Sequence, residues 1–209
     1  MQPYFAPYLG YFQLIKEVDL FIFYDDVNFI TRGWINRNYI TINNDLKKFT
    51  IPLKKPSQNK LINEIEVNWD CKEMKKLIKT FEYNLKNKPK ANYIISKLIE
   101  SKPTTISDMA ILSITLICKE LGIKTKFEKS SNLNYTKTKD KVLNLVEICK
   151  ENGFSNYVNA EGGQKIYTKK EFSDHGINLQ FLKGTSTPSL LEIMDKIDIK
   201  DELKKYELL

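Results

Sequence analysis

Helix and strand patterns alternate along the second half of this chain, and this alternation limits the folds that it can adopt. Helical patterns cover 104–122 and 139–153, and apolar strand patterns cover 124–128, 155–159 and 177–182. Chains that alternate in this way form parallel strand pairs joined by helical crossovers. We therefore predict an α/β fold, with a Rossmann-like, mostly parallel sheet and helices on both of its faces.

The first hundred residues are predicted to add a short helix, several strands and a helical insertion. The apolar periodicity predicts a helix at 10–18 and a buried strand at 20–24. Two strands joined by the turn NNDL lie within 37–53, and a short strand is predicted at 64–69. A helical pattern covers about 71–100 and is interrupted around its proline.

Length predicts one domain. The 209 residues are enough for a single sizeable core, so we assign 1–209 to one domain that carries 71–100 as an insertion. The run 189–209 has an apolar pattern of helical type, and we predict that one helix closes the chain.

Features that would place the chain in or beyond a membrane are missing from the sequence. It has no run of about 18 apolar residues, and its start has neither the basic region nor the cleavage site of a signal peptide. The three cysteines (Cys71, Cys118 and Cys149) lack metal-ligand spacing, which is typical of reduced thiols. We therefore expect a cytoplasmic protein without membrane insertion. The single histidine, His175, excludes histidine triads and multi-histidine metal sites.

The charge pattern favours a small anionic partner over nucleic acid. The net charge is +7, and the lysines are spread over the whole chain. No stretch after residue 60 combines a basic run with interleaved aromatic residues, which argues against nucleic acid. A modest positive field attracts small anions such as nucleotide phosphates.

Arg32 and Arg37 are the two arginines among 33 basic residues, and they lie five positions apart. Lysine replaces arginine where only charge matters, but it cannot make the planar, two-pronged contact with a carboxylate or phosphate. We therefore predict that both arginines belong to a catalytic site. The alternative is a chance spacing, or an arginine that stacks on Trp34.

Polar side chains follow three of the predicted strands. Asp25 and Asp26 follow the first, Ser130 and Ser131 follow the second, and Asn159 closes the third. In open α/β sheets the ligand crevice lies beyond the carboxyl ends of the strands, so these residues are predicted to share one site. One of the two aspartates would hold Mg²⁺ beside substrate phosphates or act as a base. The alternative for the aspartates is a turn or a helix cap.

The helix start at PYLGY is a second candidate for anion binding. Gly10 lies where free N–H groups and the helix dipole attract phosphate, and it permits close backbone approach. The segment EGGQ (161–164) is either a plain turn or a second anion-binding backbone nest. Further donors and aromatic surfaces complete the predicted cofactor-binding set: Gln2, Tyr4, Tyr8, Tyr11, Trp34, Asn36 and Asn38.

As a set, these residues resemble the WbqC-like family. The stretch QPYFAPYLGYFQLIKEVDLFIFYDDVNFITRGWINRN (2–38) follows that family's N-terminal signature. LICKELGIKTKFEKSSNL, ICKENGFSNYVNAEGGQKIY and GINLQFLK resemble it in the same order, so the likeness covers most of the chain. Members occur largely in bacterial polysaccharide clusters. The resemblance implies a role in O-antigen or capsule synthesis, where members have been proposed to attach amino-acid-derived acyl groups to amino sugars.

The chain departs from that family pattern in two places. Members usually have an apolar strand before the QPYF segment, and here Met1 stands where that strand would end. The resemblance therefore implies either a trimmed start or a sheet that lacks its first strand. Members also usually carry a polar and aromatic segment after the last strand, where this chain has only GTST (184–187).

The N-terminal layout is also similar to that of class I nucleotidylyltransferase-like proteins. Members of that superfamily grip nucleotide phosphates with a H-x-G-H motif, and Tyr8 and Tyr11 stand in the histidine places here. Because tyrosine cannot become a cation, Arg32 or Arg37 would have to supply the positive charge. This likeness is a fold-level analogy.

These expectations converge on an enzyme. The predicted activity is an acyl- or aminoacyl-transferase that acts on a nucleotide-linked amino sugar, with ATP and Mg²⁺ as candidate cofactors. Its partners would be the nucleotide-sugar and an acyl or amino-acid donor. Two alternatives stay open: a nucleotidyl- or glycosyl-transferase on the same ligand class, and a non-catalytic binding component of the surface-sugar machinery.

Overall fold

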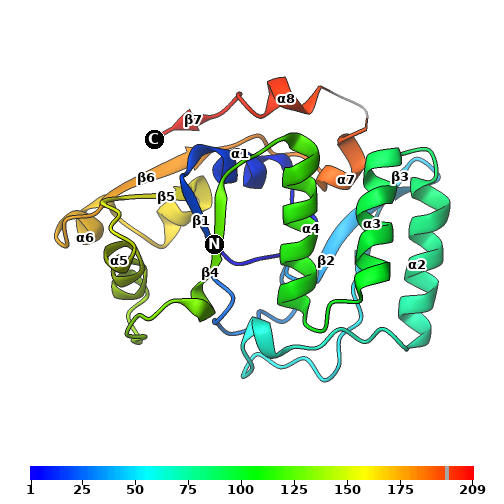
Figure 1. The fold of residues 1–209 in the computed structure, drawn as a ribbon, viewed down its shortest axis with the longest axis horizontal. Helices are drawn as coiled ribbons and strands as arrows, with labels where there is room; N and C mark the ends of the chain where they lie inside the picture. Colours follow the sequence, from blue (N-terminus) through cyan, green and yellow to red (C-terminus); the bar gives the residue numbers. More distant parts are fainter. Residues whose placement is uncertain (196–197) are drawn as a thin grey trace.

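Two parallel strand pairs carry the strand ends that the sequence predicts to be functional. In the computed structural model (Figure 1), β1 (Leu20–Phe23) pairs in parallel with β4 (Lys126–Lys129). In the same way, β5 (Asn156–Ala160) pairs with β6 (Asn178–Lys183). These four strands and their parallel pairing confirm the predicted α/β class. α1 (Leu9–Glu17) precedes β1 and lies against β5.

The two pairs do not join into one sheet, so a Rossmann-like arrangement is not confirmed. Met1 forms backbone hydrogen bonds along the edge of β1 that faces away from β4. The Met1 ammonium group donates to the Ile22 carbonyl at 2.6 Å, and the Met1 carbonyl accepts from the Tyr24 N–H at 2.8 Å. These two bonds follow the pattern of a parallel bridge. A pocket of about 260 Å³ lies between β1 and β5, and side chains of α1 and α5 (Lys141–Glu151) cover it.

The long helices begin and end at residues with capping chemistry. α4 (Ile106–Leu121) begins after Thr105, whose hydroxyl accepts the Asp108 N–H at 3.1 Å. It ends at Gly122, where a φ of +70° favours glycine. Asp140 caps the start of α5 through its carboxylate. Both predicted helices are confirmed.

An antiparallel hairpin follows β1. β2 (Arg37–Ile42) and β3 (Asp45–Thr50) are joined by Asn43 and Asn44, which both have positive φ, as a tight two-residue hairpin turn requires. The predicted hairpin is therefore confirmed. The predicted strand at 64–69 is not formed, because residues there make only isolated bridges.

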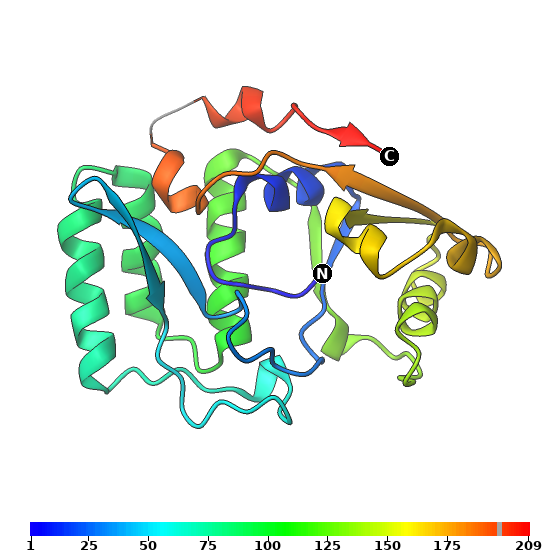
Figure 2. The same cartoon turned by 180° about the vertical axis from the view of Figure 1, so that it is seen from behind.

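The segment predicted as a helical insertion forms α2 (Lys72–Leu85) and α3 (Pro89–Ser101), and α3 begins at its proline, where the missing N–H costs no helical bond. Figures 1 and 2 show α2, α3 and α4 side by side, on the far side of β1 from β5 and β6.

The segment predicted as the turn EGGQ forms a 3₁₀ helix, Glu161–Lys165. It is followed by α6 (Lys169–Ser173).

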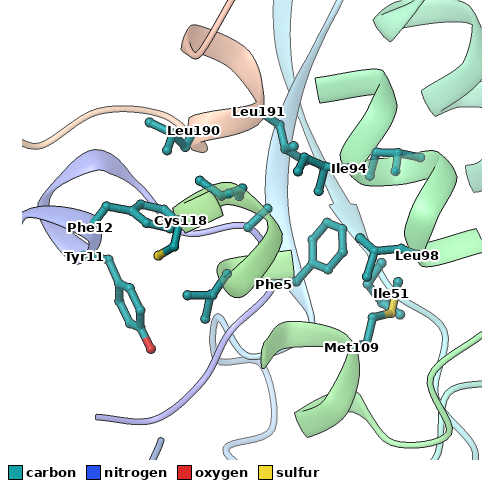
Figure 3. Packing of buried hydrophobic residues seen from close by; sticks show 14 of the residues in the cluster. Phe5, Tyr11, Phe12, Ile51, Ile94, Leu98, Met109, Cys118, Leu190 and Leu191 are labelled. Atoms are coloured by element: carbon teal, nitrogen blue, oxygen red, sulfur yellow. The ribbon is translucent and has the colours of Figure 1, made fainter. Parts of the chain in front are cut away.

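A large cluster of buried apolar side chains connects the insertion with the parallel strands. Phe5, from the N-terminal loop, packs edge-on against Phe49 of β3. Figure 3 shows its ring directed toward Leu98 of α3 and Met109 of α4. A smaller cluster lies among α5, α6 and β6. The N-terminal loop is thus part of the core, which fixes the position of the residues around it.

The C-terminal segment is not one helix, so that prediction was wrong. α7 (Leu190–Ile193) and α8 (Ile199–Glu202) are separate single turns, and β7 (Glu207–Leu208) pairs antiparallel with β6. The structure describes residues 1–195 and 198–209, so part of the predicted helix lies outside the described residues. The interruption has a local cause. The Asp198 carboxylate accepts the Lys200 N–H at 3.1 Å and starts a new helix there.

The expectations about thiols and membranes can be compared with the same structure. Cys71, Cys118 and Cys149 are all free, as the sequence predicts. Among the described residues, no helix combines the length and the apolar character that crossing a membrane requires.

Candidate functional site

The carboxyl ends of β1 and β4 bring two of the predicted pairs together. Asp25 is 1% exposed, and its two oxygens accept the Ser131 N–H at 3.1 Å and the Ser131 hydroxyl at 2.9 Å. The Ser130 hydroxyl lies between the aspartates. It accepts the Asp25 N–H at 3.2 Å and donates to the Asp26 carboxylate. Asp25 therefore joins the end of β1 to the 3₁₀ turn after β4, and its catalytic role stays a prediction.

Asp26 has the more open position and a richer set of donors. Its Oδ2 accepts the Tyr135 hydroxyl at 2.9 Å and the Lys137 ammonium at 2.9 Å. Burial opposes the ionisation of this carboxylate, but the hydrogen bonds from Ser130, Lys137 and Tyr135 outweigh it and lower the pKa of Asp26. Burial and the contact with Asp26 raise the pKa of Tyr135. At neutral pH the cluster is thus a carboxylate paired with one ammonium group and one neutral phenol.

Sequence reasoning missed Tyr135 and Lys137. Both lie in the irregular connection between β4 and α5. The Thr138 N–H donates to Asn144 at 2.7 Å, and Asn144 returns a bond to the Thr138 carbonyl at 3.0 Å, which holds this connection on α5. Lys137 is one lysine among many, and only its contact with a residue 111 positions earlier distinguishes it. No local sequence signal could have found it.

The predicted Mg²⁺ site does not fit this donor set. The oxygens of Asp25 already accept serine donors, and Lys137 stands where a cation beside Asp26 would bind. Within residues 1–195 and 198–209, no cluster of three or more His, Cys, Asp or Glu side chains is arranged to hold a metal ion. Mg²⁺ normally takes one or two carboxylates plus phosphates and water, and here the lysine already neutralises the accessible carboxylate.

Residues 32–38, which include the first two residues of β2 and which we call the arginine loop, form no ion pair with this cluster within the described residues and present an exposed ring. Arg32 is exposed and has a φ of +62°, and Trp34 is 54% exposed with its ring 5.7 Å from that of Tyr39. The Nε of Arg37 is buried without a hydrogen-bond partner. In the described part of the chain, neither arginine forms an ion pair. The structure therefore does not pair the arginines with Asp25 or Asp26.

The N-terminal segment connects the two regions. Met1 bonds to Tyr24, next to Asp25, and the Phe5 N–H donates to the Ile35 carbonyl at 3.1 Å in the arginine loop. An extended chain spans at most about 3.5 Å per residue, so the step from Met1 to Phe5 separates these contacts by no more than about 14 Å. The segment from Met1 to Phe5 therefore connects the strand end beside the aspartate cluster with the arginine loop.

Three predicted ligand-binding residues on or beside this segment have structural contacts. The Tyr11 hydroxyl donates to the Gln2 carbonyl at 3.1 Å. The rings of Tyr4 and Tyr11 meet edge to face, with centroids 5.4 Å apart. Burial raises the pKa values of both tyrosines, which therefore stay neutral. Tyr11 is 0% exposed, so it cannot touch a ligand as the sequence analysis expected.

The two asparagines of the arginine loop also serve the fold. The Asn38 amide donates to the carbonyls of Phe5 and Ala6 at 2.9 and 2.6 Å, and so uses both of its N–H groups. The Asn36 amide donates to the Ile51 carbonyl at 2.9 Å. Both side chains are buried. Asn38 therefore has no free N–H group for the predicted contact with a sugar or base, because its amide holds the N-terminal loop against β2.

The start of α1 is not an open anion site in this structure. The Gly10 N–H donates to the Thr185 carbonyl at 3.1 Å, and the Leu9 N–H donates to the Thr187 hydroxyl at 3.0 Å. A side chain on Gly184 would lie 2.7 Å from the Gly10 Cα, so the close backbone approach expected of Gly10 is made to the chain itself. The GTST segment therefore occupies the donors that were predicted for phosphate. Tyr8 is half-buried, and burial followed by the nearby Glu161 raises its pKa.

Asn159, the last predicted binding residue, lies at the pocket between β1 and β5, which Met1 and Tyr24 also line. Its side-chain oxygen accepts the N–H of Ala160 at 2.8 Å. It is half-buried and close to the carboxyl end of β1.

Comparison with known proteins gives this arrangement a family. The WbqC-like protein family matches residues 2–190, which covers most of the chain. The chain belongs to the WbqC-like family. An uncharacterized protein of Mycobacterium tuberculosis (strain ATCC 25618 / H37Rv), Rv1507c, is 26% identical over 183 residues, which cover 86% of this chain and 78% of that protein. No solved structure matches the chain.

Membership of the WbqC-like family suggests a role in polysaccharide biosynthesis. The matched range includes every residue of the aspartate cluster and of the arginine loop, and also Tyr135 and Lys137. The C-terminal residues that hold α8 on α1 lie beyond it.

Proposed function

We propose that this WbqC-like protein is an acyl- or aminoacyl-transferase that acts on the amine of a nucleotide-linked amino sugar. The proposal is carried by two regions that one short segment connects: the ionised carboxylate of Asp26, and an arginine loop that forms no ion pair within the described residues. An amino sugar on a diphosphate has an anionic end for the arginine loop and an amine, a hydrogen-bond donor, for the carboxylate.

The arginine loop would hold the nucleotide end. Arg37 has a buried Nε without a partner, and an anionic group placed there would satisfy it. A buried unsatisfied donor costs about 1–3 kcal/mol, which a phosphate oxygen would recover on binding. The exposed ring of Trp34 offers a surface on which a base can stack. Arg32, exposed on the same loop, would add a second positive charge.

The aspartate cluster would hold the amine end. Asp26 stays ionised at neutral pH because its pKa is lowered, so it makes a poor general base. Since Lys137 already neutralises its charge, it would accept a hydrogen bond from the neutral amine. Its role would be to orient the amine after the substrate has lost its proton. In the transfer step the amine nitrogen bonds to the acyl carbon, the donor's leaving group departs with its electron pair, and the amine proton passes to water. If the donor is an acyl-adenylate made from ATP, the leaving group is AMP.

Mass spectrometry tests the reaction directly. UDP-glucosamine is incubated with the protein and either ATP plus glycine or acetyl-CoA, and the nucleotide-sugar is examined for a gain of one glycyl or acetyl group. We expect N-acylated product with one donor and its loss in an Arg37→Lys variant that keeps the wild-type melting temperature. UDP release without acylation would instead indicate glycosyl transfer. Binding without any product would indicate a non-catalytic component.

A further inference from the structure

A basic groove lies at the amino-terminal ends of β1 and β4, opposite the strand ends that carry Asp26. It has a volume of about 1070 Å³ and is lined by the residues that precede β1 and β4 and by residues of α1, α5's C-terminal end and α8. Since β1 is four residues long and each residue advances about 3.3 Å, the groove begins about 13 Å along the strand from the aspartate cluster. It is therefore a separate place on the molecule.

The walls of this groove are fixed by side-chain hydrogen bonds. The Thr125 hydroxyl donates to the Ile15 carbonyl at 2.7 Å, which holds the connection before β4 on the end of α1. The buried Gln13 amide donates to the carbonyls of Glu202 and Lys205 at 2.8 and 3.0 Å, which fixes the end of α8 on the same helix. Three elements that are distant in sequence are thus joined around the groove.

Lysine is strongly enriched in the lining. Five of the 15 lining residues are lysines, although the whole chain has 33 basic residues among 209. Lys204 pairs with Asp201 at 3.4 Å. The other four are Lys16, Lys124, Lys126 and Lys200, which form no ion pair within the described residues.

Part of this charge compensates the helix ends. The C-terminal ends of α1, α4 and α5 reach the groove at Val18, Gly122 and Asn152, and each contributes about half a negative charge. Asp19 adds one more. Four unpaired ammonium groups exceed these negative charges, so the groove keeps an excess of about one to two positive charges. The helix ends alone do not account for the lysines.

Apolar side chains also line the groove. They are Leu20, Leu121, Ile123, Leu203 and Phe154, and Phe154 is 36% exposed. A groove of this volume accepts a small organic molecule. From the unpaired lysines, the apolar lining and the fixed walls, we propose that this groove binds an organic phosphate, with the phosphates on Lys16, Lys124 and Lys126 and the ring against Phe154. This site is independent of the proposed transferase reaction.

Titration calorimetry of the full chain tests this assignment with UDP, inorganic pyrophosphate and uridine as probes. To separate the groove from the arginine loop, binding is measured in the Arg37→Lys background. We expect UDP to bind more tightly than pyrophosphate, and uridine to bind too weakly to detect. Lys124→Glu combined with Lys126→Glu should weaken UDP binding at least about tenfold. Phe154→Ala should lower the affinity for UDP to the affinity measured for pyrophosphate.

A matched control distinguishes the groove from overall charge. Lys75→Glu with Lys76→Glu changes the net charge by the same amount, at two exposed lysines of α2 that form no ion pair within the described residues, and it should leave UDP binding unchanged. Equal weakening in both double variants would overturn the proposal. Loss of UDP binding through Arg37→Lys alone would place the ligand on the arginine loop and overturn it as well. Neither outcome affects the acylation assay, so the two proposals fail separately.

Discussion

The Lys137 ammonium lies 2.9 Å from the Asp26 carboxylate, and this ion pair closes the connection before α5 over the end of β1. The Asp26 side chain is 14% exposed and the Lys137 side chain 41%. The carboxylate is the more buried partner. Without the lysine it would remain buried but would have fewer donors to stabilise its charge. Together with the Ser130 hydroxyl, the lysine therefore helps to keep Asp26 ionised.

We predict that Lys137→Met raises the pKa of Asp26 and costs about 1 kcal/mol or less at neutral pH. Since the folded pKa of Asp26 is lowered, its stabilising effect is present above the unfolded value of 3.8 and is lost as pH falls through the folded pKa. The stability difference between wild type and variant should therefore shrink below about pH 4. Carboxyl NMR titration and urea unfolding measure both effects. Lys139→Met, an exposed neighbour, is the control and should change neither.

The meeting of Asp25 with Ser130 and Ser131 followed from the sequence, because each pair comes directly after a strand and parallel strands end at one edge. The partners of Asn38 did not follow. Its amide bonds lie 32 and 33 positions away in a loop whose path depends on the whole core. The apolar periodicity also wrongly predicted one closing helix, because it carries no information on the cap that Asp198 provides for a new helical turn. Tertiary contacts decided these points.

Asn38→Ala should destabilise the protein by about 2 kcal/mol, because the Phe5 carbonyl loses its donor and the Ala6 carbonyl keeps only the Ser189 hydroxyl. Asn36→Ala removes one such bond and should cost about half as much. Urea unfolding gives both values. Equal, small effects for the two variants would show that the N-terminal loop is held mainly by Phe5 packing.

Gly184→Ala should cost about 1–3 kcal/mol. Its Cβ would lie 2.7 Å from the Gly10 Cα and 2.9 Å from the Gln13 side-chain oxygen, so GTST would have to move away from α1. Gly162→Ala, whose Cβ would meet nothing within 4 Å, should stay within about 0.5 kcal/mol. Thermal unfolding compares the two, and similar losses would contradict the close approach.

The buried ammonium of Met1 should make stability depend on pH. Burial lowers its pKa from 8.0 to about 5, so between pH 5 and 8 the unfolded chain binds the extra proton and the folded chain is favoured as pH rises. Acetylation of the N-terminus removes the titrating group and keeps an N–H for Ile22. The acetylated protein should be the more stable form at pH 5–6, and the difference should narrow toward pH 8. Parallel melting curves for the two forms measure this.

The pocket between β1 and β5 leads to a related prediction. Met1 already makes the two hydrogen bonds of a parallel bridge with β1, and the pocket beyond it is covered by α1 and α5. An engineered run of four apolar, β-branched residues fused before Met1 would continue that bridge and place its side chains against both helices, as a strand buried on two faces requires. We expect a higher melting temperature and slower amide exchange at Ile22 and Val158. A Gly-Ser extension of equal length is the control, since it also removes the buried ammonium. If both extensions stabilise equally, the effect comes from the lost charge, and the pocket does not accept a strand.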